Sequence, residues 1–165
     1  MKKILLSLMR PVLLPHFWQD LLLLYPRLFA GYLMAFEFGA PKFGMPWSPP
    51  ETNLRFFEVV FWFPTDVAEY GGAFAAFPAL LAWLGAFSEA VGGLALILGF
   101  QTRLFSVLIG CTMLVAAYMQ QGDRGLWSQL PALGFLWLCL YTSVLGGGRF
   151  SIDYFISKKI QHAKV

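Results

Sequence analysis

Residues Ala79–Phe100 read ALLAWLGAFSEAVGGLALILGF, an apolar stretch in which Glu89 is the ionisable residue. About 20 consecutive apolar residues are enough to cross the hydrocarbon core of a bilayer as an α-helix. A carboxylate inside such a segment is costly, so it is expected to face the interior of a helical bundle and to have a partner there. The stretch therefore predicts a membrane-spanning helix with one buried polar position.

The composition of the whole chain agrees with a membrane protein. Of its 165 residues, 58% are hydrophobic and 13% are charged, whereas soluble domains carry about 25% charged residues. The net charge of +3 is small and the basic residues are dispersed, which argues against a nucleic-acid partner. The length suits a single domain over residues 1–165.

Three further stretches are apolar enough to span a bilayer, which predicts an all-α, integral membrane four-helix bundle. A basic N-terminal arm at residues 1–20 precedes the expected spans at residues 21–39, 79–100, 104–119 and 130–145. Basic residues concentrate in this arm, in the turn after the second span and after the fourth span. The positive-inside rule therefore predicts that both termini are cytoplasmic.

The first extracytoplasmic loop is long and rich in aromatic residues. Ser48 followed by Glu51 matches a helix-start pattern, and a run of helical spacing continues from there until Pro64. These features predict a helix that lies in the outer membrane interface, with an ordinary loop that caps the bundle as the alternative. A second interfacial helix is expected at residues 151–160, with Ser151 as its N-cap.

Ionisable residues inside or beside the spans are the candidates for a polar site. Arg27 and Glu89 are expected at similar depths in the first and second spans, which predicts an intramembrane ion pair. Glu37 lies near the outer end of the first span, and Lys42 follows just beyond it. A pair that only fixes helix register and a pair that binds a ligand or relays protons both fit this pattern.

Small residues recur at four-residue spacing on the first two spans. Gly31 and Gly39 lie on one face of the first span, and Gly85 and Gly93 flank Glu89 on the second. Because stripes of small residues let two helices approach closely, we expect these spans to pack tightly, with the ion pair in their seam.

No catalytic or metal-binding pattern accompanies these residues in the sequence. Cys111 and Cys139 lie in apolar runs without CxxC or Cys/His spacing, so they are interpreted as buried apolar residues, with a redox role as the alternative. The sequence contains no flavin motif, no suitably spaced pair of haem ligands and no convergent nucleophile, base and acid. We therefore expect no metal, and no catalytic activity from the chain alone.

Three motifs, in the same order, resemble those of DoxX-type membrane proteins. They are RLFAGYLMAFEFGAPKF (Arg27–Phe43), SEAVGGLALILGFQTR (Ser88–Arg103) and GGGRFSIDYFI (Gly146–Ile156). The resemblance implies a four-helix bundle in the bacterial cytoplasmic (inner) membrane. The family pattern marks Arg27, Lys42, Glu89, Arg103, Arg149 and Asp153. Glu37 and the long aromatic loop depart from that pattern, which points to a partner on the outer side.

Three functions remain open at this point. The small size, the lack of a catalytic pattern and the aromatic loop favour an accessory or scaffold subunit of a larger membrane complex. Such a subunit would contact membrane lipid, and it would contact other protein subunits through the first extracytoplasmic loop or the bundle surface. Because the resembled family includes a small subunit of thiosulfate:quinone oxidoreductase, the alternative is a quinone- or lipid-binding, redox-linked subunit that uses the intramembrane Arg–Glu pair. A small transporter or proton path is a third candidate.

Overall fold

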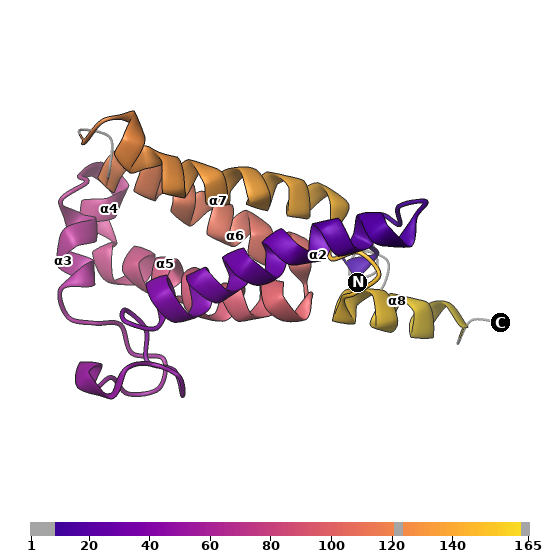
Figure 1. Ribbon diagram of the computed structural model, residues 1–165. Coiled ribbons are helices and arrows are strands. Elements are labelled where there is room, and N and C mark those ends of the chain that lie inside the picture. The colour runs from indigo at the N-terminus through magenta and orange to yellow at the C-terminus, as the bar shows by residue number, and fades with distance from the viewer. Residues whose placement is uncertain (1–8, 121–123, 163–165) are drawn as a thin grey trace.

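The computed structural model describes residues 9–120 and 124–162, and the regular elements within these residues are all helices. Four long helices lie side by side and form the bundle in Figure 1. They are α2 (Phe17–Tyr32), α5 (Pro78–Leu98), α6 (Thr102–Val115) and α7 (Leu126–Leu145). Two of them continue as short π-helices: η1 (Leu33–Gly39) follows α2, and η3 (Ala116–Gln120) follows α6.

Each long helix is apolar enough to cross a membrane. The candidate spans are Phe17–Gly39, Pro78–Leu98, Thr102–Gln120 and Leu126–Leu145. The first begins at Phe17 rather than at residue 21, and it contains Pro26, which membrane helices tolerate where neighbouring groups satisfy the backbone. The second ends at Leu98 because Gly99 adopts a left-handed conformation, with φ of 66°, and closes the helix.

The two ends of the bundle differ in character (Figure 1). Helices α3 (Phe63–Ala68) and α4 (Gly72–Ala76) lie at one end, which we call the loop end. At the opposite end, the termini end, α8 (Ile152–His162) extends away from the bundle near the segment that precedes α2. Ser151 is the N-cap of α8, as expected, because its Oγ accepts a hydrogen bond from the Tyr154 backbone N–H at 3.1 Å.

Helix α2 and its extension η1 approach α5 so closely that the glycine positions in their contact leave no room for a side chain. A Cβ atom at Gly93 would lie 2.5 Å from the Ala35 nitrogen, and one at Gly39 would lie 2.4 Å from the Ala90 nitrogen. A Cβ at Gly31 would lie 2.8 Å from the Gly93 carbonyl oxygen. The predicted tight packing of the first two spans is confirmed, and glycine is what permits it.

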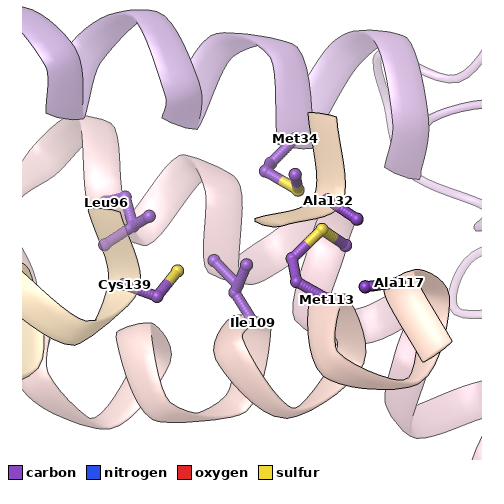
Figure 2. Close-up of a cluster of buried hydrophobic side chains, with 7 residues drawn as sticks. All are labelled: Met34, Leu96, Ile109, Met113, Ala117, Ala132 and Cys139. Carbon is purple, nitrogen blue, oxygen red and sulfur yellow. The ribbon is translucent and has the colours of Figure 1, made fainter. Parts of the chain in front are cut away.

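A core of buried apolar side chains joins all four spans, as Figure 2 shows. Its members are Met34, Leu96, Ile109, Met113, Ala117, Ala132 and Cys139. In a membrane, such packing stabilises the bundle through van der Waals contact, because lipid tails are as apolar as the core itself.

The predicted interfacial helix in the first loop is wrong. Residues 53–62 form an irregular loop, in which Asn53 and Phe57 have φ values of 48° and 63° that no right-handed helix accommodates. Val59 instead forms an isolated antiparallel bridge with Phe43. The spacing of apolar residues matched a helix, but long-range backbone pairing decides the conformation here.

The helix-start and helix-stop signals in this loop also have other roles. The Ser48 hydroxyl donates to the Phe43 carbonyl at 2.5 Å and accepts from the Met45 N–H at 2.9 Å, so it stabilises a turn and caps no helix. Pro64 begins a helix rather than ending one, since it occupies the first turn of α3.

The seam between α2 and α5 provides a first test. We expect Gly93→Ala to lower the free energy of unfolding by about 1–3 kcal/mol, the usual cost of overpacking, because the new methyl group meets backbone atoms that cannot move aside. Gly134→Ala is the matched control, since its Cβ would meet nothing within 4 Å. Unfolding of both variants in detergent measures the difference, and equal stability would contradict a close helix contact.

Candidate functional site

Glu89 lies near the middle of α5 with 4% of its surface exposed, and its Oε2 forms an ion pair with the Nζ of Lys42. Lys42 follows η1 and belongs to the turn that leaves the first span. A paired cation offsets much of the cost of a carboxylate within a membrane span. The predicted Arg27–Glu89 pair is therefore wrong, because Lys42 supplies the positive charge.

The irregular loop holds Lys42 in position through its backbone. The Lys42 carbonyl accepts a hydrogen bond from Val60 at 3.0 Å, and the Gly44 N–H donates to the Glu58 carbonyl at 2.8 Å. A Cβ at Gly44 would lie 1.8 Å from the Arg55 carbonyl oxygen, so only glycine allows this approach. The loop that replaces the expected helix is thus what orients the cation of the site.

The π-helical end of the first span contributes to the same turn. The Ala35 carbonyl accepts hydrogen bonds from the Ala40 N–H at 3.1 Å and from Nε1 of Trp47 at 3.2 Å. A π-turn inserts an extra residue into a helix and is often found beside functional sites. Here it sets the point at which the chain leaves the bundle towards Lys42.

A pocket of about 270 Å³ opens beside the ion pair, between α5 and α6 and against α3. Leu81 of α5 and Leu108 and Val115 of α6 contribute to its apolar walls. Lys42 and Glu89 contribute its charged groups. An apolar cavity with a few convergent polar groups is the usual form of a small-ligand site.

Two hydroxyl groups link the walls of this pocket. Ser88 Oγ and Thr112 Oγ1 are 2.6 Å apart, which joins α5 to α6. One hydroxyl donates to the other, and the second donates to a carbonyl of its own helix: Ser88 to Gly85 at 2.8 Å, or Thr112 to Leu108 at 3.2 Å. Neither residue could be selected from the sequence, because hydroxyl side chains can hydrogen-bond to the carbonyls of their own helix, and only the packing of α5 on α6 brings these two together.

Tyr70 lines the pocket from the segment between α3 and α4, outside the spans. Burial raises the pKa of its phenol, and the nearby carboxylates of Asp66 and Glu69 raise that pKa further. The phenol therefore keeps its proton over the physiological range and can act as a hydrogen-bond donor.

Arg27 lies at the termini end, far from Glu89. Its guanidinium donates to the carbonyl oxygens of Gly147 and Phe150, the latter at 2.5 Å. It also lies beside Gly99, where a Cβ would be 3.1 Å from Nη1. Arg27 thus fixes the segment between α7 and α8 against the end of α5.

Two carboxylates complete this second polar cluster. Asp153 accepts hydrogen bonds from the backbone N–H groups of Gln101 and Thr102, both at 2.8 Å, and so caps the N-terminus of α6. Asp20, which the sequence analysis did not select, forms an ion pair with Arg149 at 2.5 Å. Asp20 lies in the assumed N-terminal arm, and the earlier start of α2 is what places it inside the bundle.

The remaining predicted residues lie apart from the pocket or only border it. Glu37 is exposed on η1, and Arg103 lies near Gly146 at the termini end. Gly85 lines the pocket instead of the α2 seam, because each four-residue step rotates about 40° around a helix and so carries Gly85 away from the face of Gly93.

The two cysteines lie in different environments, and both are free thiols. Cys139 is buried in the core of Figure 2. Cys111 is exposed on α6 and lines the pocket. The expectation of a buried apolar cysteine is therefore confirmed for Cys139 and wrong for Cys111.

The four apolar helices and their two polar clusters define a multi-pass helical membrane protein. Residues 52–122 match the family model described as DoxX. The match covers the second and third spans, and it supports the resemblance to DoxX-type membrane proteins that the motifs indicated. The matched region contains Glu89 and Arg103, whereas Lys42 and the motifs around Arg27 and Arg149 lie outside it. No curated protein and no solved structure matches the sequence.

The Lys42–Glu89 pair can be tested by a double-mutant cycle. Lys42→Met leaves a buried carboxylate without its cation, so we expect a loss of about 3 kcal/mol in the free energy of unfolding. The double variant Lys42→Met/Glu89→Gln should lose less than the two single variants together, because the second change removes the orphaned charge. Unfolding titrations in detergent provide the four values.

Glu37→Gln is the matched control for this cycle, since Glu37 is exposed and its loss should change stability by no more than about 0.5 kcal/mol. Strictly additive effects of the Lys42 and Glu89 substitutions would contradict an energetic coupling between the two side chains.

Proposed function

We propose that the chain is a membrane subunit that binds a membrane-soluble amphiphile, a quinone or a lipid, in the pocket between α5 and α6. The observation that carries this proposal is the Lys42–Glu89 ion pair beside an otherwise apolar pocket. A pair that only fixed helix register would need no space beside it. The pocket supplies that space, together with a cation that can donate hydrogen bonds and a carboxylate that can accept them.

The chemistry of the lining residues suits binding rather than catalysis. Lys42 can donate a hydrogen bond to a carbonyl or hydroxyl oxygen of the ligand, and Glu89 can accept one from a hydroxyl group. Electron transfer to or from a bound quinone would depend on redox groups that a partner subunit supplies. The proposed role is therefore to hold the ligand at a defined place in the membrane.

A scaffold role in a larger membrane complex is the second candidate, and one observation favours it. Phe56, Phe61 and Trp62 are exposed at the loop end, with Phe61 at 87%, and they stand beside the acidic Glu58 and Asp66. Exposed aromatic residues rimmed by polar groups are typical of interaction surfaces. Binding of a ligand and contact with a partner at the loop end are compatible functions.

We also propose that the protein resides in the bacterial cytoplasmic membrane with both termini in the cytoplasm, where the basic residues of the termini end would face the anionic leaflet. Single cysteines introduced at the exposed positions Lys159 and Phe61, in a variant without native cysteines, provide the test. In intact spheroplasts, an impermeant maleimide should label the cysteine at position 61 and leave the one at position 159 unlabelled. The reverse pattern would overturn the proposed orientation.

Native mass spectrometry of the gently extracted protein tests ligand binding. We expect a bound quinone or lipid at one equivalent, and its loss in Glu89→Gln, because the carboxylate can no longer accept a hydrogen bond as an anion or hold Lys42 in place. Glu37→Gln is the control and should keep the ligand, since Glu37 is exposed and away from the pocket.

A pocket-filling variant makes the ligand test independent of the ion pair. Gly85 borders the pocket, and a Cβ there would lie 3.7 Å from Phe63, which is ordinary contact. Gly85→Leu should therefore fold and exclude the ligand by volume alone. Wild-type protein without any bound amphiphile, in spectra that preserve a partner subunit, would contradict ligand binding and favour the scaffold role.

A further inference from the structure

We propose that the ligand enters this pocket sideways from the bilayer, between α5 and α6, and that its headgroup is uncharged. The inference rests on the proposed function and specifies two properties that it leaves open, the route of entry and the charge of the headgroup. Three features of the structure support it: the place of the mouth, the cover at the loop end and the balance of charge within the pocket.

The mouth of the pocket lies on a face of the bundle that would contact lipid. Leu84 of α5 and Cys111 of α6 both line the pocket and are both exposed. On α6, Cys111 belongs to an exposed stripe at three- and four-residue spacing with Val107 and Leu114. In a membrane span, such an exposed apolar stripe faces acyl chains, so the mouth opens into the hydrocarbon region.

At the loop end, the pocket is lined mainly by aromatic and apolar side chains, together with the exposed Gln120 at the end of η3. Phe63 and Val67 of α3 line the pocket, and Phe74 of α4 joins them next to Tyr70. The Nζ of Lys42 lies 5.1 Å from the centre of the Phe63 ring, a cation–π contact that holds this cover against the ion pair. The structure therefore favours a route through the exposed face of α5 and α6 over a route from water at the loop end.

The charges of the pocket are balanced before any ligand arrives. Among the described residues that line it, Lys42 and Glu89 carry opposite charges and are paired with each other. The hydroxyl groups of Ser88 and Thr112 are hydrogen-bonded to each other, and one of them also donates to a backbone carbonyl, so both hydroxyl protons are used. A phosphate would therefore bring an uncompensated anion into a poorly hydrated site beside Glu89, at a high desolvation cost.

An uncharged headgroup avoids this cost. A carbonyl, hydroxyl or amide group can share hydrogen bonds with Lys42 and Glu89 while their pairing stays intact. The volume of about 270 Å³ is close to the lower end of small-ligand pockets, about 300 Å³, so it suits a headgroup and not a complete lipid. The tail would lie outside, along the stripe that contains Val107 and Leu114.

Cys111 provides a native reporter for the route of entry. In phosphatidylcholine nanodiscs, we expect N-phenylmaleimide, which partitions into the bilayer, to label Cys111 several-fold faster than a charged, membrane-impermeant maleimide. Peptide mapping of the wild-type protein separates Cys111 from Cys139, and the buried Cys139 should react slowly with both reagents. Equal labelling of Cys111 by the two reagents would mean that the mouth opens to water and would overturn lateral entry.

The same reporter tests the charge of the headgroup. Diacylglycerol and phosphatidic acid with identical chains differ only in the phosphate, and each is added to nanodiscs at the same mole fraction. We expect diacylglycerol, or a quinone with a single isoprenoid unit, to slow the labelling of Cys111 by N-phenylmaleimide. Phosphatidic acid should leave the rate unchanged, and Gly85→Leu should abolish the protection by the uncharged probes.

The possible outcomes separate this inference from the proposed function. Protection by phosphatidic acid that equals or exceeds protection by the uncharged probes would overturn the uncharged headgroup and leave ligand binding supported. Absence of protection by every probe, together with protein that carries no amphiphile after gentle extraction, would overturn the proposed function itself. The relative labelling rates without added probe decide the route of entry in either case.

Discussion

The close contact of the first span with α5 is the constraint on which the rest of the structure depends. Gly39 lies against Ala90 and Gly31 lies against Gly93, so the two antiparallel helices have one fixed register. That register brings the chain beyond Gly39 to the level of Glu89, where Lys42 completes the ion pair. The same register places Arg27 beside the opposite end of α5. Arg27 lies about 18 Å from Gly39 along the first span, since each residue advances a helix by about 1.5 Å.

The glycine stripe was therefore the most informative signal in the sequence. It predicted which helices touch, and the apolar stretches predicted the spans, because both signals are local and depend on helix geometry alone. The partner of Glu89 could not be predicted in the same way. Which residue pairs with Glu89 depends on where α2 begins, on the π-turns of η1 and on the loop that directs Lys42 back towards the bundle. None of these features follows from the apolar pattern of a single span.

The first loop shows the same limit in another form. Its apolar spacing fitted a helix, yet its backbone pairs with the segment around Lys42 and Gly44, and this pairing requires the left-handed conformation of Phe57. A contact between segments that are separated in sequence outweighed a local preference. Asp20 was missed for a related reason, because its burial depends on Arg149 near the other end of the chain.

The two polar clusters offset the desolvation cost of their buried charges in different ways. At the termini end, backbone groups partner Arg27, which donates to carbonyl oxygens, and Asp153, which accepts from the first N–H groups of α6, while Asp20 pairs with Arg149. Such contacts fix the chain and leave little capacity for a ligand. Glu89 has instead a single flexible side chain, Lys42, as its charged partner, and open volume lies beside the pair. Because a lysine ammonium has three donors and its ion pair with Glu89 occupies only part of that capacity, the same interaction that makes Glu89 tolerable in the membrane also leaves hydrogen bonds for a bound headgroup.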